Sequence, residues 1–187
     1  MNNRKTTNPI YLLSVMGILV SMALILSIVE SILCPQGLLP VPGFKLGMAN
    51  IAIVVSIYLL GPKPTVGIVL VRALLLWALG GNTIGLMFSL AGGLLALLSM
   101  SLLQRLPFIS LWGVSIAGAA AHMTGQIVVA IFLTGNTYVV SYLSILLLTS
   151  ILTGGVIAFL SAPVINALLH VPFVNKIQHD IMKNDHP

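Results

Sequence analysis

The chain has 187 residues, of which 58% are hydrophobic and 6% are charged. A soluble domain carries about a quarter charged residues because its surface must face water, so this composition excludes a folded soluble protein and predicts a single all-α, polytopic membrane domain. Three acidic residues are too few for the aspartate-rich clusters that hold Mg²⁺ in diphosphate chemistry, and a single cysteine excludes an internal disulfide or a CxxC metal site.

Six transmembrane helices are predicted along the chain. The first is far longer than the apolar core of a signal peptide, so we expect it to be retained. The segment 34–44 that follows contains three prolines and two glycines, which predicts an ordered loop on the membrane face. Turns rich in Gly, Pro and Asn separate the other helices. The predicted spans are 10–33, 46–60, 65–79, 84–103, 111–133 and 139–160.

The basic residues predict how these helices are oriented in the cell membrane. With the N-terminus inside, Lys45 is the only Lys or Arg in an outer loop, and the net charge of +5 comes mainly from inner segments. Both termini are therefore expected to be cytoplasmic, and the scattered charges do not form a nucleic-acid-binding stripe. Residues 1–165 form the predicted transmembrane domain. For the tail 166–187, an interfacial helix and a frayed end are both open.

Two charged side chains lie within the predicted spans. Arg72 lies near the middle of the third span, where an arginine costs at least ~2.5–3.5 kcal/mol unless it faces the protein interior and finds a partner. Glu30 is the only acid in any predicted span, so we expect it to pair with Arg72. Such a pair either marks a ligand path or only fixes the packing of the helices.

Uncharged polar side chains provide further candidates. His122 and Gln126 are four residues apart and share one helix face; they form either a wall of a substrate site or polar contacts between helices. Asn50 lies towards the outer side and either binds ligand or caps a helix, whereas a cap is the favoured interpretation for Asn82. The histidines have no short metal-ligand spacing, so no metal site is expected.

Two features point to partners at the surface. Ser14, Gly17 and Ser21 form a stripe of small residues on the first helix, which serves either internal packing or docking of another membrane subunit. Lys45 at the predicted outer mouth either attracts anions or contacts lipid headgroups.

Several motifs occur in an order that resembles a known family. They are KLGMANI at 45–51, LGPK at 60–63, Arg72, SLAGGL at 89–94 and AHMTGQ at 121–126. Over about residues 10–160, the chain resembles the Gx transporter family, also called heptaprenyl diphosphate synthase component I. That family is similar to the substrate-binding S components of energy-coupling-factor (ECF) transporters. The resemblance implies an ECF S-component-like bundle with a lid loop after the first helix and an energising subunit docked on that helix.

The leading hypothesis is a membrane-embedded transporter subunit that binds a small molecule. Its pocket would open outwards between the first, third and fifth helices, with 34–44 as a lid. Arg72 would meet an anionic or zwitterionic group, and Glu30 would orient Arg72 or bind a cationic group. His122 and Gln126 would form hydrogen bonds with the ligand. The sequence contains no P-loop motif, so an energising partner would be separate.

Two other hypotheses remain open. The resemblance implies a non-catalytic component of heptaprenyl diphosphate synthase or of quinone-linked extracellular electron transfer. Its partner would be a prenyl synthase catalytic subunit, its ligand isoprenoid or quinone-like, and its pocket open sideways to lipid. A helix-bundle scaffold predicts that Arg72→Ala impairs folding and not ligand binding. None of the three requires a catalytic residue or a cofactor.

Overall fold

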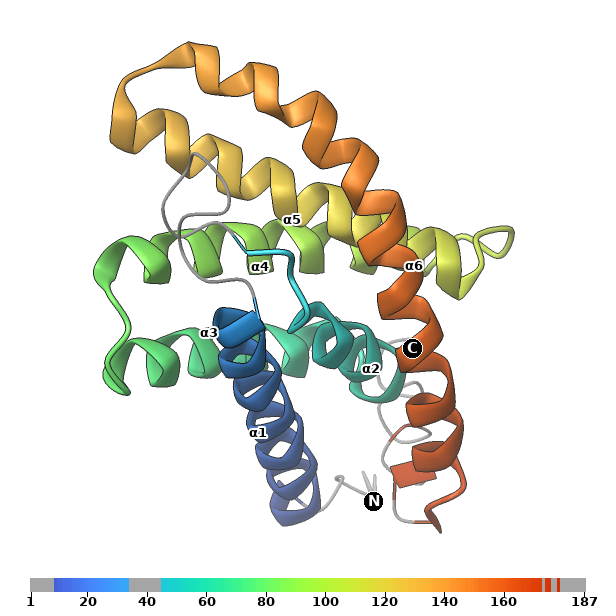
Figure 1. The fold of residues 1–187 in the computed structure, drawn as a ribbon. Helices are drawn as coiled ribbons and strands as arrows, with labels where there is room; N and C mark the ends of the chain where they lie inside the picture. The colour runs from blue at the N-terminus through green and yellow to red at the C-terminus, as the bar shows by residue number, and fades with distance from the viewer. Residues whose placement is uncertain (1–8, 34–44, 173, 176–177, 179–187) are drawn as a thin grey trace, which may run out of the picture.

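The computed structural model describes residues 9–33, 45–172, 174–175 and 178, and every regular element in this part of the chain is a helix (Figure 1). The elements are α1 (Pro9–Leu33), α2 (Asn50–Leu60), α3 (Pro62–Ala78), α4 (Thr83–Leu103), α5 (Leu111–Thr134), η1 (Thr137–Ser141) and α6 (Tyr142–Leu169). Four segments are long and apolar enough to cross a membrane, namely Ile10–Leu33, Thr83–Leu103, Leu111–Thr134 and Thr137–Leu169. The prediction of an all-α membrane protein is thus confirmed.

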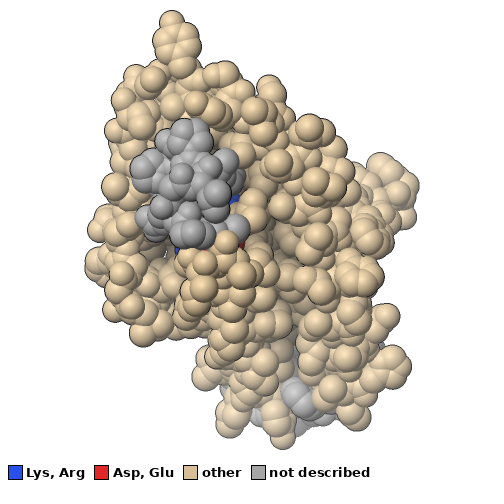
Figure 2. Space-filling view, in the orientation of Figure 1, with Lys and Arg blue, Asp and Glu red and all other residues tan. Residues whose placement is uncertain are grey.

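The surface of the molecule is apolar. Large hydrophobic side chains such as Leu98, Phe132 and Leu152 are exposed on α4, α5 and α6. On the face drawn in Figure 2, hardly any atom of Lys, Arg, Asp or Glu is visible. Such a surface suits lipid chains, whereas in water an apolar patch of this extent would drive association.

Helix α2 is short and lies at the centre of the bundle. All of its residues except Tyr58 are buried, and it contacts each of the five other α-helices. A helix that is apolar all round is buried on all sides. Its 11 residues rise only ~17 Å, about half the thickness of a membrane core. The predicted span 46–60 therefore begins too early, because 46–49 precede the helix.

The other helices are arranged around α2 in two groups. Helix α1 packs against α2 and α3, whereas α4, α5 and α6 pack side by side in chain order (Figure 1). A tight turn joins α2 to α3: Gly61 has a φ of 76°, and Pro62 opens the next helix. Proline at the first helical position and glycine at a left-handed position are the residues that such a turn requires.

Helix α6 is longer than the sequence predicts. The helix was expected to end near residue 160 because proline normally breaks a helix, but it continues through Pro163 to Leu169. Ser161 and Ile165 on either side of the proline are buried, so packing within the protein maintains the helix there. The predicted domain boundary at 165 thus lies inside α6. Of the predicted tail, 173, 176–177 and 179–187 lie outside the described residues.

Close packing of α5 on α6 provides a first prediction. A Cβ atom added at Gly154 would lie 2.5 Å from the Cα atom of Ile116, whereas one added at Gly155 would meet nothing closer than Trp112, at 3.8 Å. We expect Gly154→Ala to lower the free energy of unfolding by about 1–3 kcal/mol, because two helix backbones must separate. Gly155→Ala is the matched control and should leave the thermal midpoint in detergent unchanged or higher. Equal midpoints for the two variants would contradict this packing.

Candidate functional site

Five of the predicted site residues are buried around the start of α2. Each exposes 4% or less of its surface: Glu30, Asn50, Arg72, His122 and Gln126. They come from α1, α2, α3 and α5, so the fold brings together side chains that are far apart in the sequence. The sixth, Lys45, is half-buried in the segment that leads into α2.

Glu30 holds the start of α2. Its two carboxylate oxygens accept hydrogen bonds from the backbone N–H groups of Gly47 at 2.6 Å and Met48 at 3.2 Å. The carbonyl oxygen of Gly47 in turn accepts from the N–H of Asn50 at 2.8 Å. A carboxylate is stabilised at a helix N-terminus, where N–H groups have no partners within the helix. Both oxygens of Glu30 are thus engaged by the protein itself.

Arg72 faces the interior, but it does not form the predicted hydrogen-bonded pair with Glu30. Its Nη1 donates to the hydroxyl oxygen of Ser27 at 3.3 Å, and its Nη2 donates to that of Ser89 at 2.8 Å. The partners are two neutral serines from α1 and α4, whereas the carboxylate of Glu30 accepts from backbone N–H groups. No described residue accepts a hydrogen bond from Nε of Arg72.

Gln126 binds the backbone of Lys45. Its Oε1 accepts from the N–H of Lys45 at 3.2 Å, and its Nε2 donates to the carbonyl oxygen of Lys45 at 3.1 Å. The same Nε2 lies 2.7 Å from Nε2 of His122. Since the amide nitrogen only donates, Nε2 of His122 must be the acceptor, and the ring is the neutral tautomer with its proton on Nδ1. Gln126 and His122 therefore position Lys45.

Two glycines make room for the His122 ring. A Cβ atom added at Gly92 on α4 would lie 2.7 Å from Nδ1, and one added at Gly47 would lie 3.0 Å from Cδ2. Gly47 also has a φ of 90°, a conformation that favours glycine. The ring is thus packed between α4 and the start of α2.

The two asparagines have different roles. Oδ1 of Asn82 accepts from the N–H of Gly85 at 2.5 Å, which confirms the predicted cap of α4. The side chain of Asn50 is fully buried and caps no helix. Neither of its amide atoms has a hydrogen-bond partner among the described residues. Unpaired buried groups of this kind cost about 1–3 kcal/mol.

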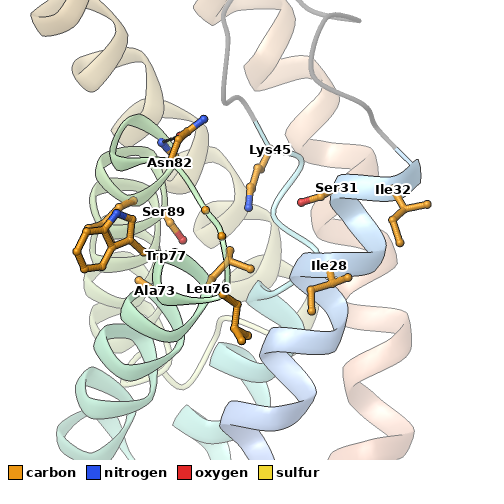
Figure 3. Close-up of a pocket in the computed structure, with 14 residues that line it drawn as sticks. Ile28, Ser31, Ile32, Lys45, Ala73, Leu76, Trp77, Asn82 and Ser89 are labelled. Atoms are coloured by element: carbon orange, nitrogen blue, oxygen red, sulfur yellow. Dashed lines mark hydrogen bonds between the residues drawn. The ribbon is translucent and has the colours of Figure 1, made fainter.

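A cavity of about 470 Å³ lies where α1 and α3 end and α4 begins (Figure 3). The side chain of Lys45 extends between these helices into the space that they enclose (Figure 3). The polar lining consists of Lys45, Ser31, Asn82 and Ser89, and the apolar lining includes Ile28, Leu76 and Trp77. Burial lowers the pKa of the Lys45 ammonium below its usual value, and the charge of Glu30 opposes this shift.

The observed pocket differs from the predicted one. It was expected between the first, third and fifth helices, but α4 and not α5 supplies the third wall. Of the six predicted binding residues only Lys45 lines it, and Arg72 lies one hydrogen bond behind Ser89. Sequence reasoning missed Ser89, whose only signal was its place in the SLAGGL motif. The predicted lid, 34–44, lies outside the described residues.

The small residues of α1 lie on its outer face. Ser14, Gly17 and Ser21 are exposed, and a Cβ atom added at Gly17 would meet nothing within 4 Å. The two serine hydroxyls donate to carbonyl oxygens of their own helix. The stripe thus packs against no other helix of the described chain. No group of three or more His, Cys, Asp or Glu side chains comes together within the described residues.

Comparison with known proteins places the chain in a family. A family model described as heptaprenyl diphosphate synthase component I matches residues 19–164. The chain belongs to this family. The match extends from α1 into α6 and includes all residues of the polar site and the pocket. No curated protein and no solved structure matches the chain, so the similarity to ECF S components stays a prediction.

The contacts of Glu30 provide a second prediction. In Glu30→Gln an NH₂ group would replace one acceptor oxygen and face a backbone N–H of Gly47 or Met48. We expect the free energy of unfolding to fall by about 1–3 kcal/mol, because a buried donor loses its acceptor. Ser14→Ala, on the exposed face of the same helix, should change it by less than about 0.5 kcal/mol. Equal thermal midpoints for Glu30→Gln and the wild type would refute the proposed role.

Proposed function

We propose that this chain is a membrane-embedded subunit that binds a small amphipathic anion as the substrate-binding part of a transporter. The observation that carries the proposal is the pocket in which the ammonium of Lys45 faces apolar walls, with Arg72 behind Ser89. Binding is assigned to this pocket, whereas Glu30, His122 and Gln126 hold the start of α2 and Lys45 in place.

The charges of the site favour an anion. Lys45 and Arg72 supply two positive charges, and Glu30 supplies one negative charge whose oxygens are both engaged by backbone N–H groups. One positive charge is therefore in excess. In a site of low dielectric such an excess attracts an anion much more strongly than it would in water.

The walls of the pocket favour an apolar ligand body. Ile28 from α1 and Leu76 and Trp77 from α3 line the cavity together with the polar groups. Its volume of about 470 Å³ lies within the range of about 300–1,000 Å³ that is usual for small-molecule sites. A ligand with one anionic end and an apolar body satisfies both parts of the lining.

We propose six helices with both termini in the cytoplasm, which puts the pocket on the outer side. Lys63 and Arg105 lie at the opposite ends of α3 and α4 from the pocket, and basic residues favour the cytoplasmic side. Exposed aromatic rings occur at both ends of the bundle: Trp77 and Tyr138 at one, and Trp112 at the other. Such rings prefer the two membrane interfaces. The ligand would then be captured from outside the cell.

Active transport would require an energising partner, since the sequence has no P-loop motif. The exposed stripe of Ser14, Gly17 and Ser21 is the face that we propose for docking it. Small residues let two membrane helices approach closely, which supplies the packing that drives association in lipid.

The family description favours a second candidate, a non-catalytic membrane component of a heptaprenyl diphosphate synthase. A prenyl diphosphate is also an amphipathic anion, so the same pocket suits its charged end. The two candidates differ in the partner. A transporter subunit would bind an ATP-driven membrane module, whereas a synthase component would bind a prenyl synthase catalytic subunit. In either role we propose that the chain is not itself catalytic. A neutral quinone would leave the excess charge of the site uncompensated.

Substitution of Lys45, the lysine that lines the pocket, tests the binding proposal. We expect Lys45→Met to weaken the binding of decanoate to the protein in zwitterionic nanodiscs by about tenfold or more, because a charge-assisted hydrogen bond is lost. Lys63→Met also removes one lysine but lies far from the pocket, and it should leave the dissociation constant unchanged. The proposal fails if decanoate does not bind the wild type, or if Lys45→Met binds it equally well.

The docking proposal is tested with the partner itself. A tagged chain purified from its native membrane should retain an ATP-driven module if it is a transporter subunit, and a prenyl synthase catalytic subunit if the second candidate is right. In either case we expect Gly17→Leu to abolish the copurification and to leave decanoate binding unchanged, since the stripe is remote from the pocket. Copurification that survives this substitution would exclude the stripe as the docking face.

A further inference from the structure

We propose that Ser89 donates a hydrogen bond to the anionic end of the ligand, and that Arg72 acts on the ligand only through this hydroxyl. The inference rests on the proposed function and narrows its substrate class to a compact oxyanion, a carboxylate or a phosphate, on an apolar body. Ser89 is then a binding residue and Arg72 a positioning residue.

The direction of the hydrogen bond between Arg72 and Ser89 is fixed by chemistry. A guanidinium has donors only, so the hydroxyl oxygen of Ser89 accepts from Nη2 at 2.8 Å. The hydroxyl proton of Ser89 must then point elsewhere, and it reaches no acceptor among the described residues. Because Ser89 lines the cavity, this proton is available to a ligand.

Ser27, the other partner of Arg72, has no hydroxyl proton left to donate to a ligand. Its oxygen accepts from Nη1 at 3.3 Å, and its own proton is donated to the carbonyl oxygen of Ala23 at 2.8 Å. It does not line the cavity. Ser27 therefore only holds the guanidinium, whereas Ser89 both holds it and faces the pocket.

The other polar groups of the pocket are mostly donors as well. The Lys45 ammonium only donates, and it makes no hydrogen bond within the described residues. Oδ1 of Asn82 is occupied by the N–H of Gly85, which leaves the NH₂ group. Ser31 donates its proton to the carbonyl oxygen of Ser27 at 2.8 Å, so its side chain can only accept a hydrogen bond from a ligand. A pocket with three donor groups fits an oxyanion, which only accepts.

Gly93 on α4 lies beside Val69 and the guanidinium. A Cβ atom added there would meet Cγ1 of Val69 tightly, at 3.0 Å, and Nη2 of Arg72 at an ordinary contact distance of 3.6 Å. A hydrogen bond from a cation also polarises the hydroxyl that accepts it, which strengthens the bond that this hydroxyl donates. The positive charge of Arg72 thus reaches the ligand without direct contact.

The test compares Ser89→Ala with Ser27→Ala, since each removes one acceptor of Arg72 and only the first removes a pocket donor. The chain has two tryptophans, so a Trp112→Phe background leaves Trp77 as a fluorescent reporter in the pocket. Decanoate, decyl phosphate and decanol are titrated into the protein in zwitterionic nanodiscs. These probes share one alkyl chain and differ in the end group. Thermal unfolding is measured on the same samples.

We expect Ser89→Ala to weaken the binding of at least one of the two anions by about tenfold and that of decanol by less than about threefold. The anion with the larger effect identifies the ligand class. Ser27→Ala should lower the thermal midpoint to a similar degree but leave the affinity for the anions within about threefold. Ser89→Thr keeps the hydroxyl and should retain anion binding.

Equal losses of anion affinity in the two alanine variants would overturn the inference, because placement of Arg72 alone would then explain them. The inference would also be overturned if Ser89→Ala weakened the binding of decanol as much as that of the anions. If neither anion binds the wild type, the proposed function falls and this inference with it. If both anions bind and Lys45→Met weakens them but Ser89→Ala does not, only this inference falls.

Discussion

The structure depends on keeping one guanidinium inside an apolar helix bundle. Water is absent from such an interior, so the protein itself must supply acceptors for the donors of Arg72. Serines on α1 and α4 do so, and these bonds join α3 to α1 and α4. The charge is not neutralised by direct contact, which leaves a positive potential directly behind the pocket. We infer that the ligand completes this arrangement.

A second set of contacts positions Lys45, the cation that lines the pocket. Glu30 from α1 and Gln126 from α5 bind the backbone of the segment before α2 at different residues. Lys45 is thus fixed at its main chain, while its side chain extends into the cavity (Figure 3). The central helix α2 explains how this is possible: it starts inside the bundle, so the segment before it lies among the polar side chains and not in the lipid.

Much of the fold could be predicted from composition and spacing, because lipid constrains helices strongly. The apolar content predicted the membrane helices, and the rule against unpaired charge in lipid correctly predicted that Arg72 and Glu30 face inwards. Helix α6 was predicted too short, because the packing of Ser161 and Ile165 that carries it past Pro163 is a tertiary effect. The start of α2 was predicted too early, and its burial on all sides is likewise set by tertiary packing.

The partners of the polar residues were less predictable. Opposite charges suggested that Glu30 pairs with Arg72, but the carboxylate instead accepts hydrogen bonds from the backbone N–H groups of Gly47 and Met48. A sequence pattern shows side chains and not the directions of backbone groups. Ser89 was missed because a serine in an apolar helix usually bonds to its own backbone, and nothing in the spacing marks this one as a partner of Arg72.

Native mass spectrometry of the protein released directly from its own membrane tests the central claim most directly, since it identifies what the excess positive charge retains. The account predicts one molecule per chain with an anionic carboxylate or phosphate end and an apolar body, either a solute or a polyprenyl phosphate. Retention of a neutral or cationic molecule at this stoichiometry, or a bare chain that gains no mass when decanoate is added, would contradict it.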